Sequence, residues 1–68
     1  MKLHYYADTD SLYIDLSPNP SAESREIAPG LVVDFDDKGH VVGIDIDHAS
    51  ATLDLKKVEV EALPVAVG

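Results

Sequence analysis

The stretch "VVDFDDKGHVVGIDID", residues 32–47, decides the fold of this chain because it is compatible with two different structures. In the first, Asp34, Asp36 and Asp45 occupy positions 1, 3 and 12 of an EF-hand calcium loop. An EF-hand also requires an oxygen ligand at position 5, a glutamate at position 12 and a helix on each side. Lys38 stands at position 5, and both flanks are rich in β-branched residues, which favour strands. The calcium loop is therefore rejected.

The second structure is a β-hairpin with a two-residue turn at Lys38-Gly39. One face of this hairpin is apolar and the other is mostly acidic, whereas a shift of one residue mixes the two faces. We therefore interpret the acids as the solvent-facing side of a hairpin. The predicted pairs are Asp37–His40, Asp36–Val41, Phe35–Val42, Asp34–Gly43, Val33–Ile44, Val32–Asp45 and Leu31–Ile46.

Alternating apolar and polar residues predict further strands on both sides of this hairpin. Residues 2–7 and 11–16 are expected to pair around a four-residue turn, with Ala7 opposite Leu12 and His4 opposite Asp15. Residues 25–28 form a short strand that ends at Pro29-Gly30, where proline and glycine favour a turn.

Beyond the deciding hairpin, residues 48–55 lose the alternation and fit a helical turn or two, and residues 57–63 alternate again as a possible sixth strand. Residues 63–68 are expected to fray. The sequence predicts one mainly β domain over residues 1–68. Its expected architecture is an antiparallel β-meander of about five to six short strands with one short helix near the C-terminus.

Composition limits the classes of function. The chain has 68 residues and no cysteine, which excludes disulfides and thiolate metal sites. A fold this small usually needs another source of stability, such as self-association. The formal net charge of −8 disfavours nucleic acid and anionic membranes as partners and favours a cationic one. Without a signal-peptide pattern or an apolar run of ~20 residues, we expect a cytoplasmic protein.

Several motifs resemble a small prokaryotic family of uncharacterised proteins, domain of unknown function 2283. They are "DSLYI" (10–14), "REI" (25–27), "VDFDDKGHVVGIDI" (33–46) and "AS" (49–50). The chain departs from the family pattern at Lys38, Asp47 and His48. The resemblance implies a compact β-rich domain without an assigned activity or transferable catalytic residues. It also implies an antitoxin-like or partner-binding role, because relatives are encoded beside small toxin-like proteins.

One candidate site lies on the outer face of the first hairpin. Two aromatic side chains and a His–Asp pair meet there, and they could bind a ligand or a second subunit. Ordinary cross-strand pairing of the same side chains is the alternative. The candidate residues are His4, Tyr6, Tyr13 and Asp15.

A second group, Asp36, Asp37 and His40, lies at the tip of the deciding hairpin and could bind a divalent cation weakly. Acids at hairpin tips more often form the turn itself, so we expect no metal and no cofactor. The serines lie in turns or caps with no His–acid pair fixed near them, and nucleophilic catalysis has no support. We therefore expect no catalytic residues.

Two classes of function remain. The first is a non-enzymatic protein-binding module that forms a homodimer or another homo-oligomer, or that neutralises a small basic toxin as an antitoxin-like protein. The second is a metal-dependent or small-ligand enzyme whose site forms between subunits, with His4, Asp15, Asp36 and His40 as candidates.

Overall fold

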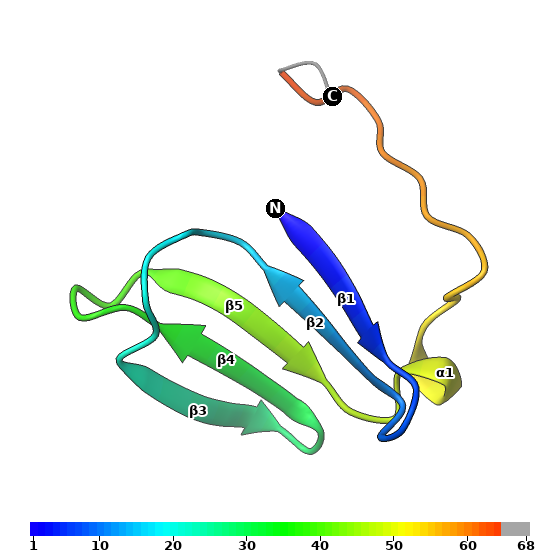
Figure 1. Cartoon of the computed structure of the whole chain (residues 1–68), viewed down its shortest axis with the longest axis horizontal. Helices are drawn as coiled ribbons and strands as arrows, with labels where there is room; N and C mark the ends of the chain where they lie inside the picture. The colour runs from blue at the N-terminus through cyan, green and yellow to red at the C-terminus, as the bar shows by residue number, and fades with distance from the viewer. Residues whose placement is uncertain (65–68) are drawn as a thin grey trace.

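A computed structural model describes residues 1–64 of the chain as a single antiparallel sheet followed by one turn of helix (Figure 1). The predicted mainly β class, with one short helix after the strands, is confirmed. The elements are β1 (Lys2–Tyr6), β2 (Ser11–Asp15), β3 (Glu23–Ala28), β4 (Leu31–Phe35), β5 (Val41–Ile46) and α1 (Ala49–Thr52).

The strand order is β1-β2-β5-β4-β3, which differs from a simple meander at one connection. After β2 the chain crosses to the far edge of the sheet through a loop that contains Pro18 and Pro20. Strands β3, β4 and β5 then return toward β2, so that β5 becomes the central strand (Figure 1). The stretch that decides the fold therefore supplies β4 and β5. β5 joins the β1–β2 hairpin to the β3–β4 hairpin, because it pairs with β2 on one side and with β4 on the other.

The register of β4 against β5 agrees with the prediction from Leu31 to Asp34. Val33 lies opposite Ile44, and Asp34 lies opposite Gly43, as expected. Beyond Asp34 the prediction was wrong, because a β-bulge shifts the register by one residue and places Phe35 opposite Val41 rather than Val42.

The bulge accompanies a longer turn than the two-residue one predicted. The backbone N–H of Asp36 donates to the carbonyl of His40 (2.9 Å), which leaves Asp37, Lys38 and Gly39 as the loop. Gly39 has a φ of 82°, the left-handed conformation that closes a three-residue hairpin loop. The sequence "DDKG" therefore forms a three-residue loop, and Lys38-Gly39 alone does not make the turn.

The first hairpin also pairs differently from the prediction. Tyr6 lies opposite Ser11 and His4 lies opposite Tyr13, so the turn spans residues 7–10. The predicted pairs Ala7–Leu12 and His4–Asp15 were wrong by two residues. A shift of two residues preserves the pleat, and each side chain keeps its predicted face. The turn position follows from Asp10, whose φ of 53° is left-handed.

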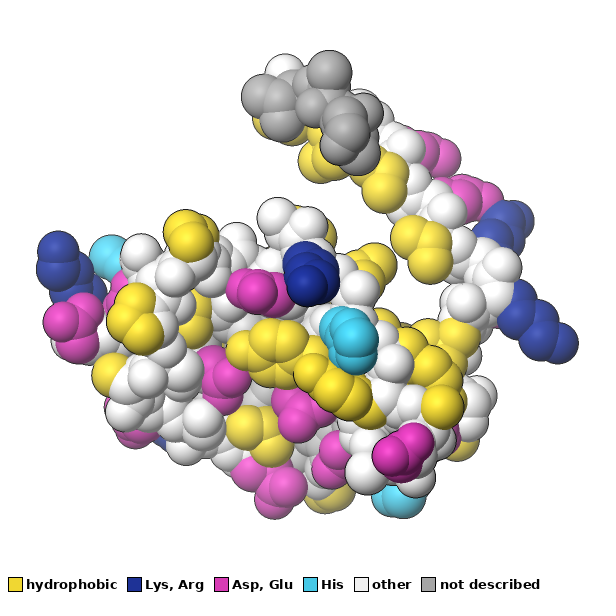
Figure 2. All heavy atoms as spheres, in the orientation of Figure 1, with side chains coloured by type: hydrophobic (Ala, Val, Ile, Leu, Met, Phe, Trp, Pro, Cys, Tyr) yellow, Lys and Arg dark blue, Asp and Glu magenta, His cyan; other side chains and the backbone are white. Residues whose placement is uncertain are grey.

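The two faces of the sheet differ in character. One carries apolar side chains from the four strands β1, β2, β5 and β4, and we call it the apolar face. The other, the polar face, carries acidic side chains over its middle, with a histidine and hydrophobic groups beside them (Figure 2). By register and alternation, the apolar face holds Leu3, Tyr5, Leu12, Ile14, Leu31, Val33, Phe35, Ile44 and Ile46.

Little covers the apolar face. Among the described residues, only Val33, Val42 and Ala49 are buried hydrophobic side chains, and no large side chain is completely buried. Residues 57–63, predicted as a sixth strand, form no strand in the structure. After α1 they run as an extended segment that stays apart from β1 (Figure 1). The predicted fraying falls largely on residues 65–68, which lie outside the described part of the chain.

Within residues 1–64, no helix has the length and apolar character needed to cross a membrane.

Candidate functional site

A chain of hydrogen bonds crosses the polar face from β2 to β3. The hydroxyl of Tyr13 on β2 donates to Oδ2 of Asp34 on β4 at 2.8 Å. The hydroxyl of Ser24 on β3 donates to Oδ1 of the same carboxylate at 2.5 Å. Both carboxylate oxygens of Asp34 are therefore bound, and three strands are linked by side chains in addition to their backbone pairing.

Tyr13 reaches Asp34 by passing over β5 at Gly43. A Cβ atom at position 43 would lie 1.9 Å from the Tyr13 hydroxyl oxygen and 2.6 Å from the ring carbon that bears it. No side chain fits in that space, so the glycine in "VVGI" is required by the tyrosine ring above it. The family-like motifs "DSLYI" and "VVGI" thus meet through Tyr13 and Gly43.

The acidic surroundings affect the ionisation of this face. The hydrogen bond to Asp34, followed by burial and by the nearby negative charges, raises the pKa of Tyr13 to about 12. Burial, with Asp47 and Asp34 close by, raises the pKa of Asp45 above its usual value. The polar face therefore disfavours further negative charge and favours a cationic neighbour.

The predicted constellation of His4, Tyr6, Tyr13 and Asp15 lies on this face, but its members do not all meet. The rings of His4 and Tyr6 are in contact, with centroids 4.3 Å apart and planes tilted by 54°. His4 pairs with Tyr13, while Asp15 lies opposite Lys2 and Gly43, so no His4–Asp15 pair forms across the strands. A role for these residues in binding stays a prediction.

The hairpin tip brings together two of the three residues considered for a metal. Nδ1 of His40 lies 3.4 Å from Oδ2 of Asp36. No group of three His, Cys, Asp or Glu side chains suited to a metal ion forms among residues 1–64, so Asp37 does not complete a ligand set. The four candidates for a shared enzyme site, His4, Asp15, Asp36 and His40, are likewise divided between the first hairpin and this tip.

Asp36 instead organises its own turn. It is buried, and its Oδ1 accepts the backbone N–H groups of Lys38 and His40, both at 2.9 Å. Donation by the backbone N–H of His40, assisted by that of Lys38, lowers the pKa of Asp36 although burial opposes this. Asn19 of the β2–β3 loop also reaches Oδ2 at 3.5 Å. The acid therefore fixes the loop and has no free oxygen pair for a cation.

A second carboxylate, Asp10, ties the first hairpin to α1. Its Oδ2 accepts the Ser50 hydroxyl at 2.7 Å, and its Oδ1 accepts the Tyr5 hydroxyl at 2.7 Å. The backbone N–H of Ser50 donates to the same carboxylate, and that of Ala49 donates to the Asp10 carbonyl at 2.8 Å. These bonds, from the Ser50 hydroxyl first and then from Tyr5, lower the pKa of Asp10. Asp10 thus caps a helix that follows it by about 40 residues.

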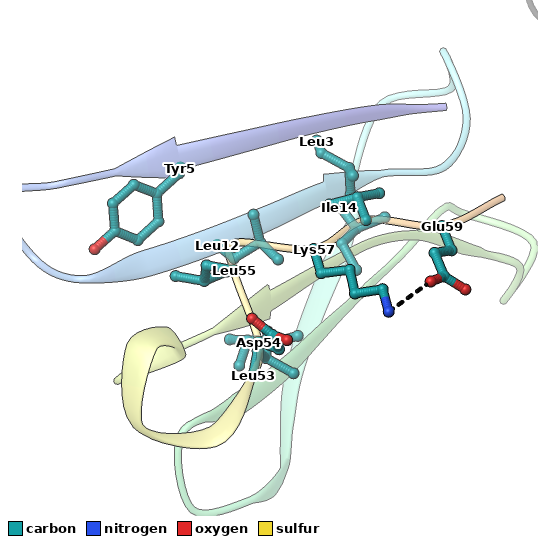
Figure 3. A pocket seen from close by; sticks show the side chains of 11 residues that line it. Leu3, Tyr5, Leu12, Ile14, Leu53, Asp54, Leu55, Lys57 and Glu59 are labelled. Atoms are coloured by element: carbon teal, nitrogen blue, oxygen red, sulfur yellow. Dashed lines mark ion pairs between the residues drawn. The ribbon is translucent and has the colours of Figure 1, made fainter.

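An open groove lies on the opposite side of the sheet, where the apolar face meets the segment after α1. This groove has a volume of about 810 Å³ and opens to solvent. Figure 3 shows side chains of β1 and β2 on one side of it and those of the segment on the other. Its lining is Leu3, Tyr5, Leu12, Ile14, Ile46, Leu53, Asp54, Leu55, Lys57, Val58 and Glu59.

Within residues 1–64, these features define a small mainly β protein built on one sheet, whose apolar face is covered only in part. Residues 2–50 match the family described as proteins of unknown function (DUF2283), and the chain belongs to that family. The resemblance noted in the sequence is therefore confirmed. Searches of curated proteins and of solved structures found no match.

Sequence reasoning missed the Tyr13–Asp34–Ser24 chain and the Asp10 cap. A glycine inside a strand pattern signals a close approach by another group, and Gly43 was the available clue to the first. No local pattern indicates that Asp10 and Ser50 meet, because that contact depends on the position of α1 in the folded chain.

Proposed function

We propose that this protein is a non-enzymatic binding module that acts by self-association through its apolar face. The observation that carries the proposal is the exposure of that face in a single chain. Leu3 is 47% exposed and Tyr5 is 43% exposed, although both point to the side of the sheet that holds the apolar residues. A sheet normally packs such a face against another layer. Here a second copy supplies that layer most simply, as a two-fold dimer.

The groove supports the same proposal. It is mostly apolar, and it is lined by three strands of the sheet and by the segment after α1, which leaves it open rather than sealed (Figure 3). Covering it would remove apolar surface from water at about 25 cal/mol per Å². Because small domains are only marginally stable, burial of this surface would add usefully to the stability of the folded chain.

A matched pair of variants tests which face is used. Leu3 and Tyr6 lie on the same strand, are 47% and 50% exposed, and point to opposite faces. We expect Leu3→Lys to shift the protein toward a monomer of 7.3 kDa, whereas Tyr6→Lys leaves the oligomer intact. Light scattering over a range of micromolar concentrations measures both.

The reverse result would assign the interface to the polar face, where the predicted candidates were His4, Tyr6, Tyr13 and Asp15. A wild-type mass that stays at 7.3 kDa at every concentration would overturn self-association altogether. Circular dichroism of each variant shows whether the sheet is retained.

The acidic polar face favours a second, heterotypic function. With a net charge of −8, and with Asp15, Asp34 and Asp45 on one face, the module suits a small basic protein as its partner. An antitoxin-like role is the specific form of this hypothesis. Retention of a small basic host protein at low salt and its release at high salt would support it. Stoichiometric metal in the purified protein would favour the enzyme alternative instead.

A further inference from the structure

We propose that residues 57–61 act as an exchange arm, which adds to the free edge of β1 in a second copy of the chain. This inference rests on the proposed self-association and specifies how the two copies are joined. It makes the segment a sixth strand of the partner's sheet.

The arm has the composition of a strand without the pairing of one. Its sequence "KVEVE" alternates polar and apolar residues with a period of two, which is the pattern of a half-buried strand. Val58 is 68% exposed and Val60 is 61% exposed. Among the described residues, the only backbone hydrogen bond recorded for the arm is a local one, from the Lys57 N–H to the Asp54 carbonyl.

The edge of β1 offers the complementary pattern. Among residues 1–64, β1 pairs only with β2, so the other side of β1 presents backbone groups without a strand partner in that part of the chain. Its sequence "KLHYY" (2–6) has the same length as the arm, and its apolar-face residues, Leu3 and Tyr5, stand at the same positions within it as Val58 and Val60 do in the arm. Addition of the arm places Val58 and Val60 beside Leu3 and Tyr5, at the margin of the apolar face that the second copy covers in the proposed dimer.

Charge also matches across this pair. Lys2 projects from β1 on the polar face, and the arm would bring Glu59 and Glu61 to the same face. Lys2 is one of only five Lys and Arg residues in the chain, against 13 Asp and Glu, and it lies on the edge strand that the arm would join. Opposite charges on neighbouring strands stabilise their pairing.

A second copy fits better than the same chain as the acceptor. Leu53, Leu55 and Val58 already line the groove beside Leu3 and Tyr5 within one chain, yet the segment continues past β1 without pairing to it (Figure 1). Reciprocal exchange about a two-fold axis would pair both β1 edges at once. It would also close the assembly, whereas a free edge permits open-ended growth.

Thiol-specific cross-linking tests the arm directly, because the natural chain has no cysteine. One chain carries His4→Cys, and the other carries Glu59→Cys and an affinity tag that distinguishes its mass. After mixing, we expect a covalent dimer that contains both chains. The control replaces the second chain with one that carries Ser21→Cys in the β2–β3 loop, and there we expect no such product.

A second measurement compares variants of equal exposure. Val60 is 61% exposed in the arm, and Ile27 is 60% exposed on β3 at the opposite edge. Val60→Ser should weaken the dimer by about tenfold or more, since two valine side chains lose their burial in each dimer. Ile27→Ser should leave the dissociation constant unchanged.

The outcomes separate the two proposals. A wild-type dimer that gives no His4–Glu59 product and is unaffected by Val60→Ser would overturn the arm and leave self-association standing. A third chain carries both His4→Cys and Glu59→Cys. A cross-link that forms only within this chain, and never between two chains, would show pairing within one copy and would also overturn the arm. A wild-type monomer would overturn the proposed function, and the arm with it.

Discussion

Gly43 shows how a single residue constrains the polar face. The space above it is filled by Tyr13, and a Cβ atom there would collide with the phenol ring. Any side chain at this position must therefore push the ring aside and break the hydrogen bond to Asp34.

We predict that Gly43→Ala destabilises the protein by about 1–3 kcal/mol, the usual range for overpacking. Chemical denaturation measures the loss. In a Tyr13→Ala background the same substitution should cost much less, because the ring is gone. Equal costs in both backgrounds would mean that the glycine is required by the backbone and not by the tyrosine.

A second prediction at this scale concerns ionisation. The pKa of Tyr13 is raised to about 12, above the value near 10 of an unfolded tyrosine. Its neutral form is therefore favoured by folding. This contribution to stability is complete below pH ~10 and is lost as the pH rises toward ~12. Ultraviolet titration should show late tyrosinate formation that loses amplitude in Tyr13→Phe. Part of it should remain, because the hydrogen bond from Tyr5 to Asp10 also raises the pKa of Tyr5. A late phase of unchanged amplitude in Tyr13→Phe would assign it to other tyrosines.

At the scale of elements, α1 depends on a contact from outside itself. It is one turn long, and its N-cap residue, His48, provides no side-chain cap. Asp10, from the first hairpin, supplies the missing acceptor for Ser50. The helix therefore holds its position only while the hairpin turn is formed.

This dependence predicts an acid-sensitive attachment. The pKa of Asp10 is lowered in the folded state, so its carboxylate stabilises the fold above the unfolded value near 3.9. The contribution is lost as the pH falls through the folded value. Asp10→Asn should lower the unfolding midpoint at pH 7, and the difference from wild type should shrink at about pH 3. Asp8→Asn, in the same turn, is the control. An equal effect of both variants would contradict a specific role for Asp10.

The elements also show which features a sequence can predict. The sequence predicted the five described strands, and alternation also predicted the faces of most residues in β1, β2, β4 and β5, because side-chain direction along a strand depends on local pleating. The turns of the β1–β2 and β4–β5 hairpins were misplaced, because the contacts of a carboxylate set the position of each. Asp36 accepts two backbone N–H groups and lengthens its loop, and Asp10 binds a helix distant in sequence. The pattern in residues 57–63 predicts a strand, but a strand forms only beside another strand with which it can pair. Within residues 1–64, no strand pairs with this segment.

At the scale of the whole molecule, charge opposes the proposed association of two copies through the apolar face. Each chain carries −8, so two copies repel each other at low salt. Salt screens this repulsion, with a Debye length of about 10 Å at 0.1 M, and leaves apolar contact intact. We predict that the dimer tightens between ~0.02 and ~0.5 M sodium chloride, as measured by sedimentation equilibrium. A dimer that weakens with salt would indicate that ion pairs, rather than the apolar face, hold it together.

The position of β5 in the sheet has a consequence for the order of events during synthesis. β5 is the last of the described strands along the chain, and it lies between β2 of the β1–β2 hairpin and β4 of the β3–β4 hairpin, pairing with both. A nascent chain that ends before residue 41 holds two separate hairpins, each with an apolar side and with no partner between them. We therefore expect the five-stranded sheet to assemble only after β5 has left the ribosome, because β5 joins segments that are made far apart in time. Isolated two-stranded hairpins are at best marginally stable, so a chain interrupted before β5 should remain largely unfolded, and folding should be a late, non-local event.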